Sequence, residues 1–117
     1  WGRVVAISSF VAHTFGANDV IFPSTAAAKG AVEALAKALA YQLASEGVTV
    51  NCVAPGLLEG TRGTANLRVE QIERAAGGSL LKKAADKEDC ADMVVTMCRT
   101  DTMTGQTAVI DAGRGVH

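Results

Sequence analysis

Residues 48–56, Val-Thr-Val-Asn-Cys-Val-Ala-Pro-Gly, decide the fold because they join a strand to a sharp turn. Residues 48–53 are mostly apolar, which is typical of a buried strand, and the Ala-Pro-Gly tripeptide ends it. A similar apolar run at residues 3–7 predicts a strand buried on both faces. A third run at residues 107–111 predicts the last strand.

Residues 24–45 carry the clearest helix signal in the chain. Apolar side chains recur there at helical spacing and form one stripe. They are Val32, Leu35, Leu39 and Leu43. A second row contains only small residues, which lets another backbone approach closely; its members are Ala26, Gly30, Ala34 and Ala38. Pro23 suits the start of the helix and Ser24 its N-cap, and Gly47 is expected to follow its end.

Downstream of the Ala-Pro-Gly turn, the sequence predicts a short helix over residues 67–76, capped by Asn66. A longer helix is expected over residues 86–98, with Asp86 as its cap. Residues 10–22 lack a clear period and are expected to form a loop. The order strand, helix, strand, helices, strand indicates an α/β fold whose parallel strands are joined by right-handed crossovers.

The composition is that of a small globular domain and excludes several classes of protein. The 117 residues are 49% hydrophobic and 20% charged, with a formal net charge of −1. No basic run indicates nucleic-acid binding, and no apolar stretch approaches the roughly 18 residues of a membrane span. The start of the chain lacks the regions of a signal peptide, so we expect a cytoplasmic protein.

The cysteines and histidines predict neither a disulfide framework nor a metal site. Cys52, Cys90 and Cys98 are odd in number and form no Cys-x-x-Cys motif, so free thiols in a reducing cytosol are expected. His13 and His117 have no metal-ligand spacing.

Thr25 and Lys29 are four residues apart on the expected helix, so their side chains share one face. A lysine beside a tyrosine at that spacing would form an acid/base pair, because a nearby cation lowers the pKa of a phenol. This chain has a threonine in the place of the phenol. The pair therefore has the spacing of a catalytic site without its proton-transfer group.

Four segments occur in a set order along the chain. They are residues 2–9 (Gly-Arg-Val-Val-Ala-Ile-Ser-Ser), 26–32 (Ala-Ala-Ala-Lys-Gly-Ala-Val), 48–56, and 104–113 with Thr-Gly-Gln-Thr at its start and Asp-Ala-Gly at its end. Together they resemble the C-terminal half of the short-chain dehydrogenase/reductase family. The resemblance implies a doubly wound Rossmann-type parallel sheet, to which this chain supplies the last three strands and their helices.

The same resemblance implies that residues 1–117 are the C-terminal portion of a single Rossmann-type domain. The N-terminal nucleotide-binding half, with its glycine-rich phosphate loop, is absent from the sequence. A first strand without a partner leaves an apolar edge with unpaired backbone groups. We therefore expect a piece of a larger fold, or a fold completed by another chain.

Three residues match the catalytic residues of the family. Ser9 matches the serine that holds the substrate oxygen, Lys29 matches the lysine that bonds the nicotinamide ribose, and Thr25 occupies the tyrosine position. An aliphatic hydroxyl is too short and too weakly acidic to replace the phenol, so acid/base catalysis worth roughly 10²–10⁴-fold is expected to be lost. The only tyrosine, Tyr41, lies about 24 Å farther along the helix, which leaves His13 as the candidate stand-in; an ordinary loop histidine is the alternative interpretation.

NAD or NADP is the cofactor that the resemblance implies, although the residues that choose between them lie outside this sequence. Pro55 and Gly56 would lie beside the nicotinamide at the carboxyl end of their strand, where open α/β sheets bind ligands. The alternative interpretation is that they form a plain turn. The backbone of Leu58 would bond the carboxamide. Thr61 matches a threonine of the family that contacts the cofactor. In that alignment Gly60 is one residue more than the family has.

Two functions follow from these observations. The first is an NAD(P)-dependent oxidoreductase with a degenerate active site, acting on a small-molecule carbonyl or alcohol. The second is a catalytically inactive subunit, a structural or regulatory partner of an active homologue in a homo- or hetero-oligomer. A simple binding module for a nucleotide or acyl group is a more distant third interpretation.

Overall fold

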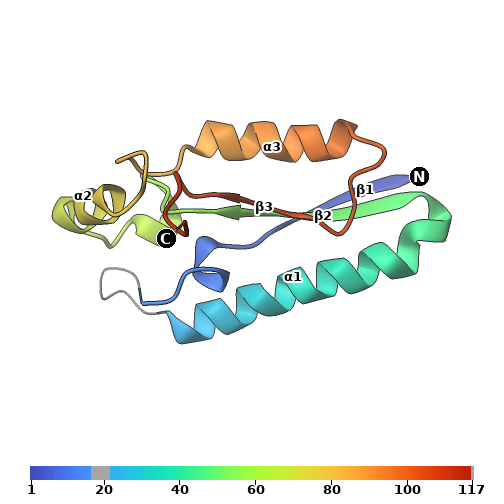
Figure 1. The fold of residues 1–117 in the computed structure, drawn as a ribbon, viewed down its shortest axis with the longest axis horizontal. Coiled ribbons are helices and arrows are strands. Elements are labelled where there is room, and N and C mark those ends of the chain that lie inside the picture. Colours follow the sequence, from blue (N-terminus) through green and yellow to red (C-terminus); the bar gives the residue numbers. More distant parts are fainter. Residues whose placement is uncertain (17–21, 117) are drawn as a thin grey trace.

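The fold is a small parallel sheet between two helices, seen in a computed structural model that describes residues 1–16 and 22–116. The strands β1 (Gly2–Ile7), β2 (Val48–Pro55) and β3 (Thr107–Ile110) lie in the order β1-β2-β3. Helix α1 (Pro23–Leu43) covers one face, and α3 (Lys87–Arg99) covers the other (Figure 1). The predicted α/β fold with parallel strands is confirmed.

Strand β2 is the centre of the core, and residues 49–54 of it are buried. Successive side chains of a strand point to opposite faces, so β2 contributes to two apolar clusters. Val50 and Cys52 pack with Ala36 and Ala40 of α1. On the other face, Val53 packs with two buried residues of α3, Cys90 and Met97.

Helix α1 contacts the sheet through alanines rather than through the full leucine stripe. Ala36 and Ala40 are each 5% exposed, whereas Leu35 is 58% exposed. The predicted stripe is therefore wrong at Leu35, because small side chains bring the helix close to β2 and turn Leu35 outward. The helix also begins at Pro23 without a side-chain cap, so Ser24 is not its N-cap.

Of the two later helices, α2 differs from the prediction at its start, whereas α3 agrees with it. Helix α2 (Val69–Gly77) is preceded by Arg68 and not by Asn66, and the Arg68 N–H is satisfied by Gln71 Oε1 at 2.9 Å. Helix α3 has the predicted cap, since Asp86 Oδ1 accepts a 2.7 Å hydrogen bond from Glu88 N. At the end of α1, Gly47 has the expected left-handed conformation, with φ +70°.

The described residues also form short 3₁₀ turns. They are η1 (Phe10–Ala12) and η4 (Arg62–Thr64), and a third turn, η3 (Ala44–Glu46), extends α1. Part of the loop predicted for residues 10–22, namely residues 17–21, lies outside the described residues.

Strand β1 is at the edge of the sheet and pairs with β2 from Gly2↔Val48 to Ile7↔Val53. Val4 is 42% exposed and Ile7 is 50% exposed. The prediction of a strand buried on both faces is therefore wrong for this chain, because an edge strand has a neighbouring strand on one side only.

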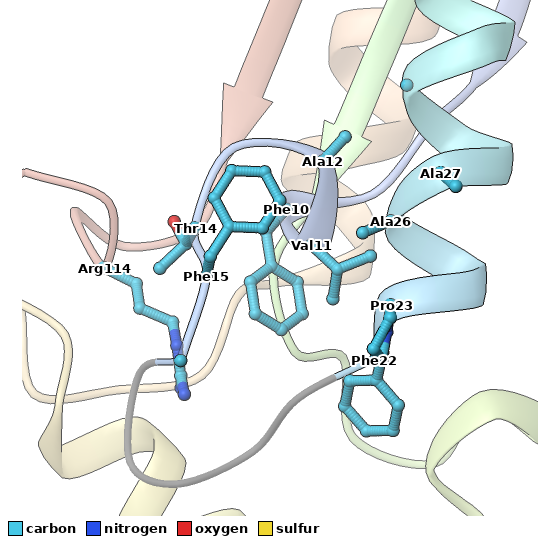
Figure 2. A pocket seen from close by; sticks show the side chains of 12 residues that line it. Phe10, Val11, Ala12, Thr14, Phe15, Phe22, Pro23, Ala26, Ala27 and Arg114 are labelled. Carbon is cyan, nitrogen blue, oxygen red and sulfur yellow. The ribbon is translucent and has the colours of Figure 1, made fainter.

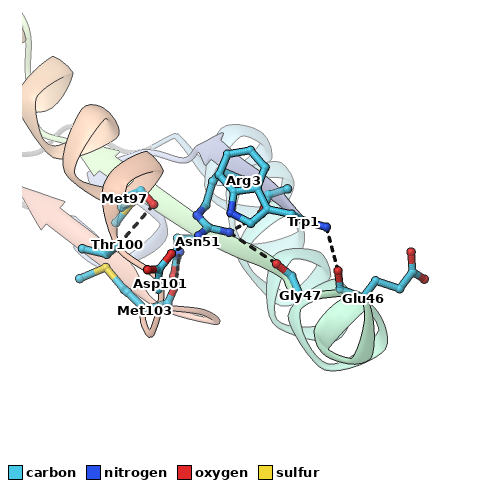
Figure 3. A network of polar contacts seen from close by, with 10 residues as sticks. Trp1, Arg3, Glu46, Gly47, Asn51, Met97, Thr100, Asp101 and Met103 are labelled. Carbon is cyan, nitrogen blue, oxygen red and sulfur yellow. Dashed lines mark hydrogen bonds and ion pairs between the residues drawn. The ribbon is translucent and has the colours of Figure 1, made fainter.

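Asn51 joins β2 to the segment that leads into β3 (Figure 3). It is fully buried, and its Nδ2 donates to Met103 O at 2.8 Å while its Oδ1 accepts from Gln106 N at 3.0 Å. A buried amide is tolerated here because both of its polar atoms have partners. The position of β3 beside β2 therefore depends on this side chain.

The three cysteines are free thiols. Cys52 and Cys90 are buried, and burial raises the pKa of each thiol above its ordinary value; Cys98 is exposed. Within residues 1–16 and 22–116, no cluster of three or more His, Cys, Asp or Glu side chains is arranged to hold a metal ion. No helix in the same ranges has the length and apolar character needed to cross a membrane.

Candidate functional site

The predicted site residues gather around the carboxyl ends of the strands. Ser8 N, just after β1, donates to Val53 O of β2 at 2.8 Å, and Gly56 N, just after β2, donates to Ile110 O of β3 at 2.7 Å. Helix α1 begins at the same end of the sheet (Figure 1). Open α/β sheets bind ligands beyond these strand ends, so the fold places the residues where a ligand is expected.

The serine pair after β1 has two different environments. Ser8 is 3% exposed. Ser9 is half-buried and caps η1, with its Oγ accepting a 3.4 Å hydrogen bond from Val11 N. Within the described part of the chain, Ser9 Oγ has no hydrogen bond to an ionisable side chain.

Lys29 lies beside the end of β1, where its Nζ donates to Ile7 O at 2.8 Å. Thr25 lies one turn earlier in α1 and is exposed. Its hydroxyl forms no hydrogen bond with residues 1–16 or 22–116. The structure thus brings Lys29 close to the serine pair through the backbone of β1, whereas the Thr25 side chain is exposed and has no such bond.

His13 does not contact Ser9 directly but contacts Glu33, a residue that sequence reasoning missed. His13 Nε2 lies 2.8 Å from Glu33 Oε1, and Ser8 Oγ donates a hydrogen bond to the same oxygen. The available signal was spacing: Glu33 follows Lys29 by one helical turn and so shares its face. An acidic residue on the same helix face as Lys29 could therefore have indicated that Glu33 belongs to the site.

Gly56 stands at a close approach between the ends of β2 and β3. A Cβ atom at this position would lie 2.7 Å from Asp111 Cα and 2.9 Å from Asp111 Cβ. Contacts this short leave no room for a side chain. The glycine therefore has a packing role, whether or not a nicotinamide lies beside Pro55 and Gly56.

We expect Gly56→Ala to lower the free energy of unfolding by about 1–3 kcal/mol, the typical cost of overpacking a core. Urea denaturation of the natural-length protein measures it. The matched control is Gly77→Ala, because a Cβ at Gly77 meets no atom within 4 Å. Equal stability of the two variants would contradict the close approach.

The loop after Gly56 is held by hydroxyl groups. Leu58 O accepts from Thr61 Oγ1 at 3.3 Å and from Thr64 Oγ1 at 2.7 Å. Thr61 also caps η4, and Gly60 has the left-handed φ of +68° that starts this turn. Sequence reasoning missed Thr64, which is buried, because a threonine in a polar loop has no distinctive pattern.

An apolar cavity of about 480 Å³ lies between η1 and the start of α1 (Figure 2). Aromatic rings and small helix residues line it, together with the guanidinium group of Arg114. The described lining includes Phe10, Phe15, Phe22, Ala26, Gly30 and Arg114. Thr25, Lys29 and Ser9 are not among the lining residues, so the cavity neighbours the predicted catalytic residues without containing them.

Among the described residues that line the cavity, Arg114 is the charged one. It is 4% exposed, its Nη1 donates to Ala75 O at 2.9 Å, and its guanidinium lies 5.3 Å from the centre of the Phe10 ring. Burial lowers the pKa of Arg114 from its ordinary value, and the nearby carboxylate of Asp111 opposes that shift. The guanidinium stacked on an aromatic ring fits a cation–π contact.

Comparison with solved structures confirms the Rossmann-type arrangement. The TT0495 protein from Thermus thermophilus aligns with a TM-score of 0.88 at 31% identity, covering 100% of this chain and 50% of that one. A small-chain dehydrogenase in complex with NADPH aligns with a TM-score of 0.83 at 22% identity, covering 98% and 52%. At that lower identity the likeness concerns the fold alone.

Comparison with known sequences identifies the family. The sequence model of a family described as enoyl-(acyl carrier protein) reductase matches residues 1–114. The 3-oxoacyl-[acyl-carrier-protein] reductase FabG of Buchnera aphidicola subsp. Acyrthosiphon pisum is 32% identical over 114 residues, which are 96% of this chain and 45% of FabG. The short-chain dehydrogenase/reductase homolog YusR of Bacillus subtilis is 33% identical over 113 residues, 97% of this chain and 83% of YusR.

Apart from YusR, the chain spans about half the length, or less, of these relatives and solved structures. The match nevertheless runs over nearly all of its own residues. With both sequence and fold in agreement, the chain belongs to the short-chain dehydrogenase/reductase family.

Proposed function

We propose that the chain is the C-terminal portion of an NAD(P)-dependent oxidoreductase domain whose active site is degenerate. The observation that carries this proposal is the position of Lys29, whose ammonium group is bonded to Ile7 O at 2.8 Å, two residues before Ser9. Thr25 stands one turn earlier, where the family has a tyrosine. The site thus keeps the residues that hold cofactor and substrate, and lacks the phenol that moves the proton.

The described residues fit the nicotinamide end of such a cofactor. A lysine ammonium has three donors, and Lys29 uses one of them on Ile7 O. The N–H of Leu58 donates to none of the described residues, which leaves it available for a carboxamide oxygen. When bound, the nicotinamide would supply or accept the hydride.

In this proposal Ser9 holds the oxygen of a small carbonyl or alcohol, and Lys29 holds the ribose. The proton at that oxygen is left to the Thr25 hydroxyl or to water, and both are poor acids near neutral pH. Pro55, Gly56 and Thr61 complete the nicotinamide side through backbone shape and loop closure. The choice between NAD and NADP belongs to residues outside this chain.

The edge of β1 supports the proposal that another half-domain completes the sheet. Val4 and Ile7 are exposed there, and an edge with apolar side chains is a template for a further strand. We place a nucleotide-binding half beside β1, either in a longer form of the same chain or in a second chain. A cytoplasmic location agrees with the reducing conditions that free thiols need.

A catalytically inactive partner subunit is the second candidate function. It is favoured by the exposed position of Thr25 and by the apolar surface of α1, where Leu35 is 58% and Tyr41 is 88% exposed. Such a surface suits contact with another copy of this chain or with an active homologue. In that case the incomplete active site would serve assembly of the oligomer rather than turnover of a substrate.

Cofactor binding and turnover test the proposal in the protein at its natural length. NADH and NADPH binding is measured by nucleotide fluorescence, and turnover is measured with a panel of carbonyl substrates. Binding with slow turnover is expected. Binding without any turnover supports the inactive subunit, and no binding of either nucleotide overturns the cofactor proposal. Turnover at ordinary enzyme rates overturns the degenerate site.

A further inference from the structure

Glu33 joins three segments of the chain at one carboxylate oxygen. Ser8, at the end of β1, donates its hydroxyl to Glu33 Oε1, and His13, after η1, places Nε2 at 2.8 Å from the same atom. Glu33 itself lies on α1. The Glu33 side chain is 13% exposed and the His13 side chain 35% exposed, so the carboxylate is largely withdrawn from water while the imidazole is partly exposed to it.

The chemistry of the three groups fixes where the protons lie. A carboxylate only accepts hydrogen bonds, so the Ser8 hydroxyl hydrogen points to Glu33. For the same reason Nε2 of His13 must carry a hydrogen, which sets the tautomer of the neutral ring. Hydrogen bonds to a charged group are stronger than those between neutral groups, and a carboxylate so little exposed needs them.

This carboxylate holds both ends of the turn that carries Ser9. Ser8 precedes Ser9 in the chain, and Ser9 is the N-cap of η1. His13 is the C-cap of the same turn. Because Glu33 bonds to the residues on either side of η1, the direction of Ser9 relative to α1 is set by Glu33.

Lys29 is held in the same frame. It lies one helical turn before Glu33, and its Nζ bonds to Ile7 O next to Ser8. Ser8 Oγ also lies 3.5 Å from Lys29 O. The two side chains proposed to hold substrate and ribose are therefore positioned through one helix and one strand end, which Glu33 connects.

We propose that Glu33 is a positioning residue that fixes the Ser9 turn against α1, at the distance from Lys29 that a bound substrate and cofactor require. The inference rests on the proposed function of Ser9 and Lys29. Glu33 acts through Ser8 and His13 and does not itself touch the reacting atoms.

Hydrogen exchange tests the positioning without any need for turnover. The turn is closed by backbone bonds from Ala12 N to Ser9 O at 3.1 Å and from His13 N to Phe10 O at 2.9 Å. In Glu33→Ala these amides are expected to exchange about tenfold faster, the factor that corresponds to a lost hydrogen bond to a charged group. Amides of α3 are expected to keep their rates, whereas general destabilisation would raise the global exchange of both regions.

Two further variants distinguish the hydrogen bonds of Glu33 from its negative charge and from a general loss of stability. Glu33→Gln keeps an oxygen that accepts from Ser8 and His13, so slow exchange of the turn is expected to be largely restored. Glu46→Ala removes an exposed carboxylate from the end of the same helical segment and is expected to change neither region. If Glu33→Ala does not fold, Ser8→Ala combined with His13→Ala tests the same two bonds.

Kinetics in the Thr25→Tyr background then link the turn to chemistry. Glu33→Ala is expected to lower kcat by about tenfold to a hundredfold while the nucleotide Kd stays within about twofold, because misplacement of a substrate-holding group affects the reacting geometry. Unchanged exchange in the turn, or exchange that rises equally in α3, overturns the inference. Unchanged kcat in a variant whose turn is loosened also overturns it, whereas failure of every variant to bind nucleotide overturns the proposed function instead.

Discussion

Thr25→Tyr is expected to raise the turnover of carbonyl substrates by roughly 10²–10⁴-fold, the usual contribution of a positioned acid or base. The new phenol would stand on the same face of α1 as Lys29, one turn away. The ammonium group would favour the phenolate and so lower its pKa, whereas it cannot bring an aliphatic hydroxyl into the useful range. Initial rates with NADPH and with NADH across pH 6–10, on the natural-length protein, measure the effect.

Thr25→Phe is the matched control for this prediction. It adds the same ring and the same packing without the hydroxyl, so its rate is expected to stay at the level of the wild type. If the tyrosine and phenylalanine variants have equal rates, the hydroxyl at this position is not the missing group. The degenerate-site proposal would then lose its chemical basis.

Asn51→Ala is expected to lower the free energy of unfolding by about 1–3 kcal/mol, because it removes two hydrogen bonds worth about 0.5–1.5 kcal/mol each and leaves two part-buried backbone groups without partners. The orphaned groups are Met103 O and Gln106 N, now bonded at 2.8 Å and 3.0 Å. Since these bonds hold the approach to β3, the loss falls on the sheet itself. Urea denaturation followed by circular dichroism provides the measurement.

The control for that prediction is Asn66→Ala. Asn66 is exposed, and its side chain forms no hydrogen bond with the described residues, so its removal is expected to change stability by less than about 0.5 kcal/mol. If both asparagine variants unfold at the same denaturant concentration, the bridge from β2 to the β3 approach does not contribute to stability.

Sequence patterns predicted the elements whose signals come from long runs of residues. Strand β2 and helix α1 lie where the apolar run and the helical spacing placed them, because burial of one continuous face determines both. Helix starts were less predictable. Helix α1 begins at Pro23, as that residue type suggested, but Ser24 is not its cap, because a cap depends on backbone angles that residue type alone does not fix.

The candidate site shows a similar division. Ser9, Lys29 and Gly56 lie near the strand ends that the topology required, because parallel strands bring their carboxyl ends to one edge. Their roles in binding and catalysis stay predictions. Glu33 and Thr64 were not predicted, since each acts through contacts with residues far away in the chain or hidden in a loop, and no local spacing reveals such contacts.

The hydrogen bond between Lys29 and the Ile7 carbonyl has a consequence for the thermodynamics of ligand capture. A lysine has four flexible carbons, and immobilising such a chain costs up to about 2 kcal/mol of rotamer freedom. Folding has already restricted the Lys29 side chain, so an incoming ligand meets an ammonium donor that is ordered in advance. Binding of a ligand to Lys29 should therefore carry a smaller entropic penalty than binding to a freely moving ammonium group.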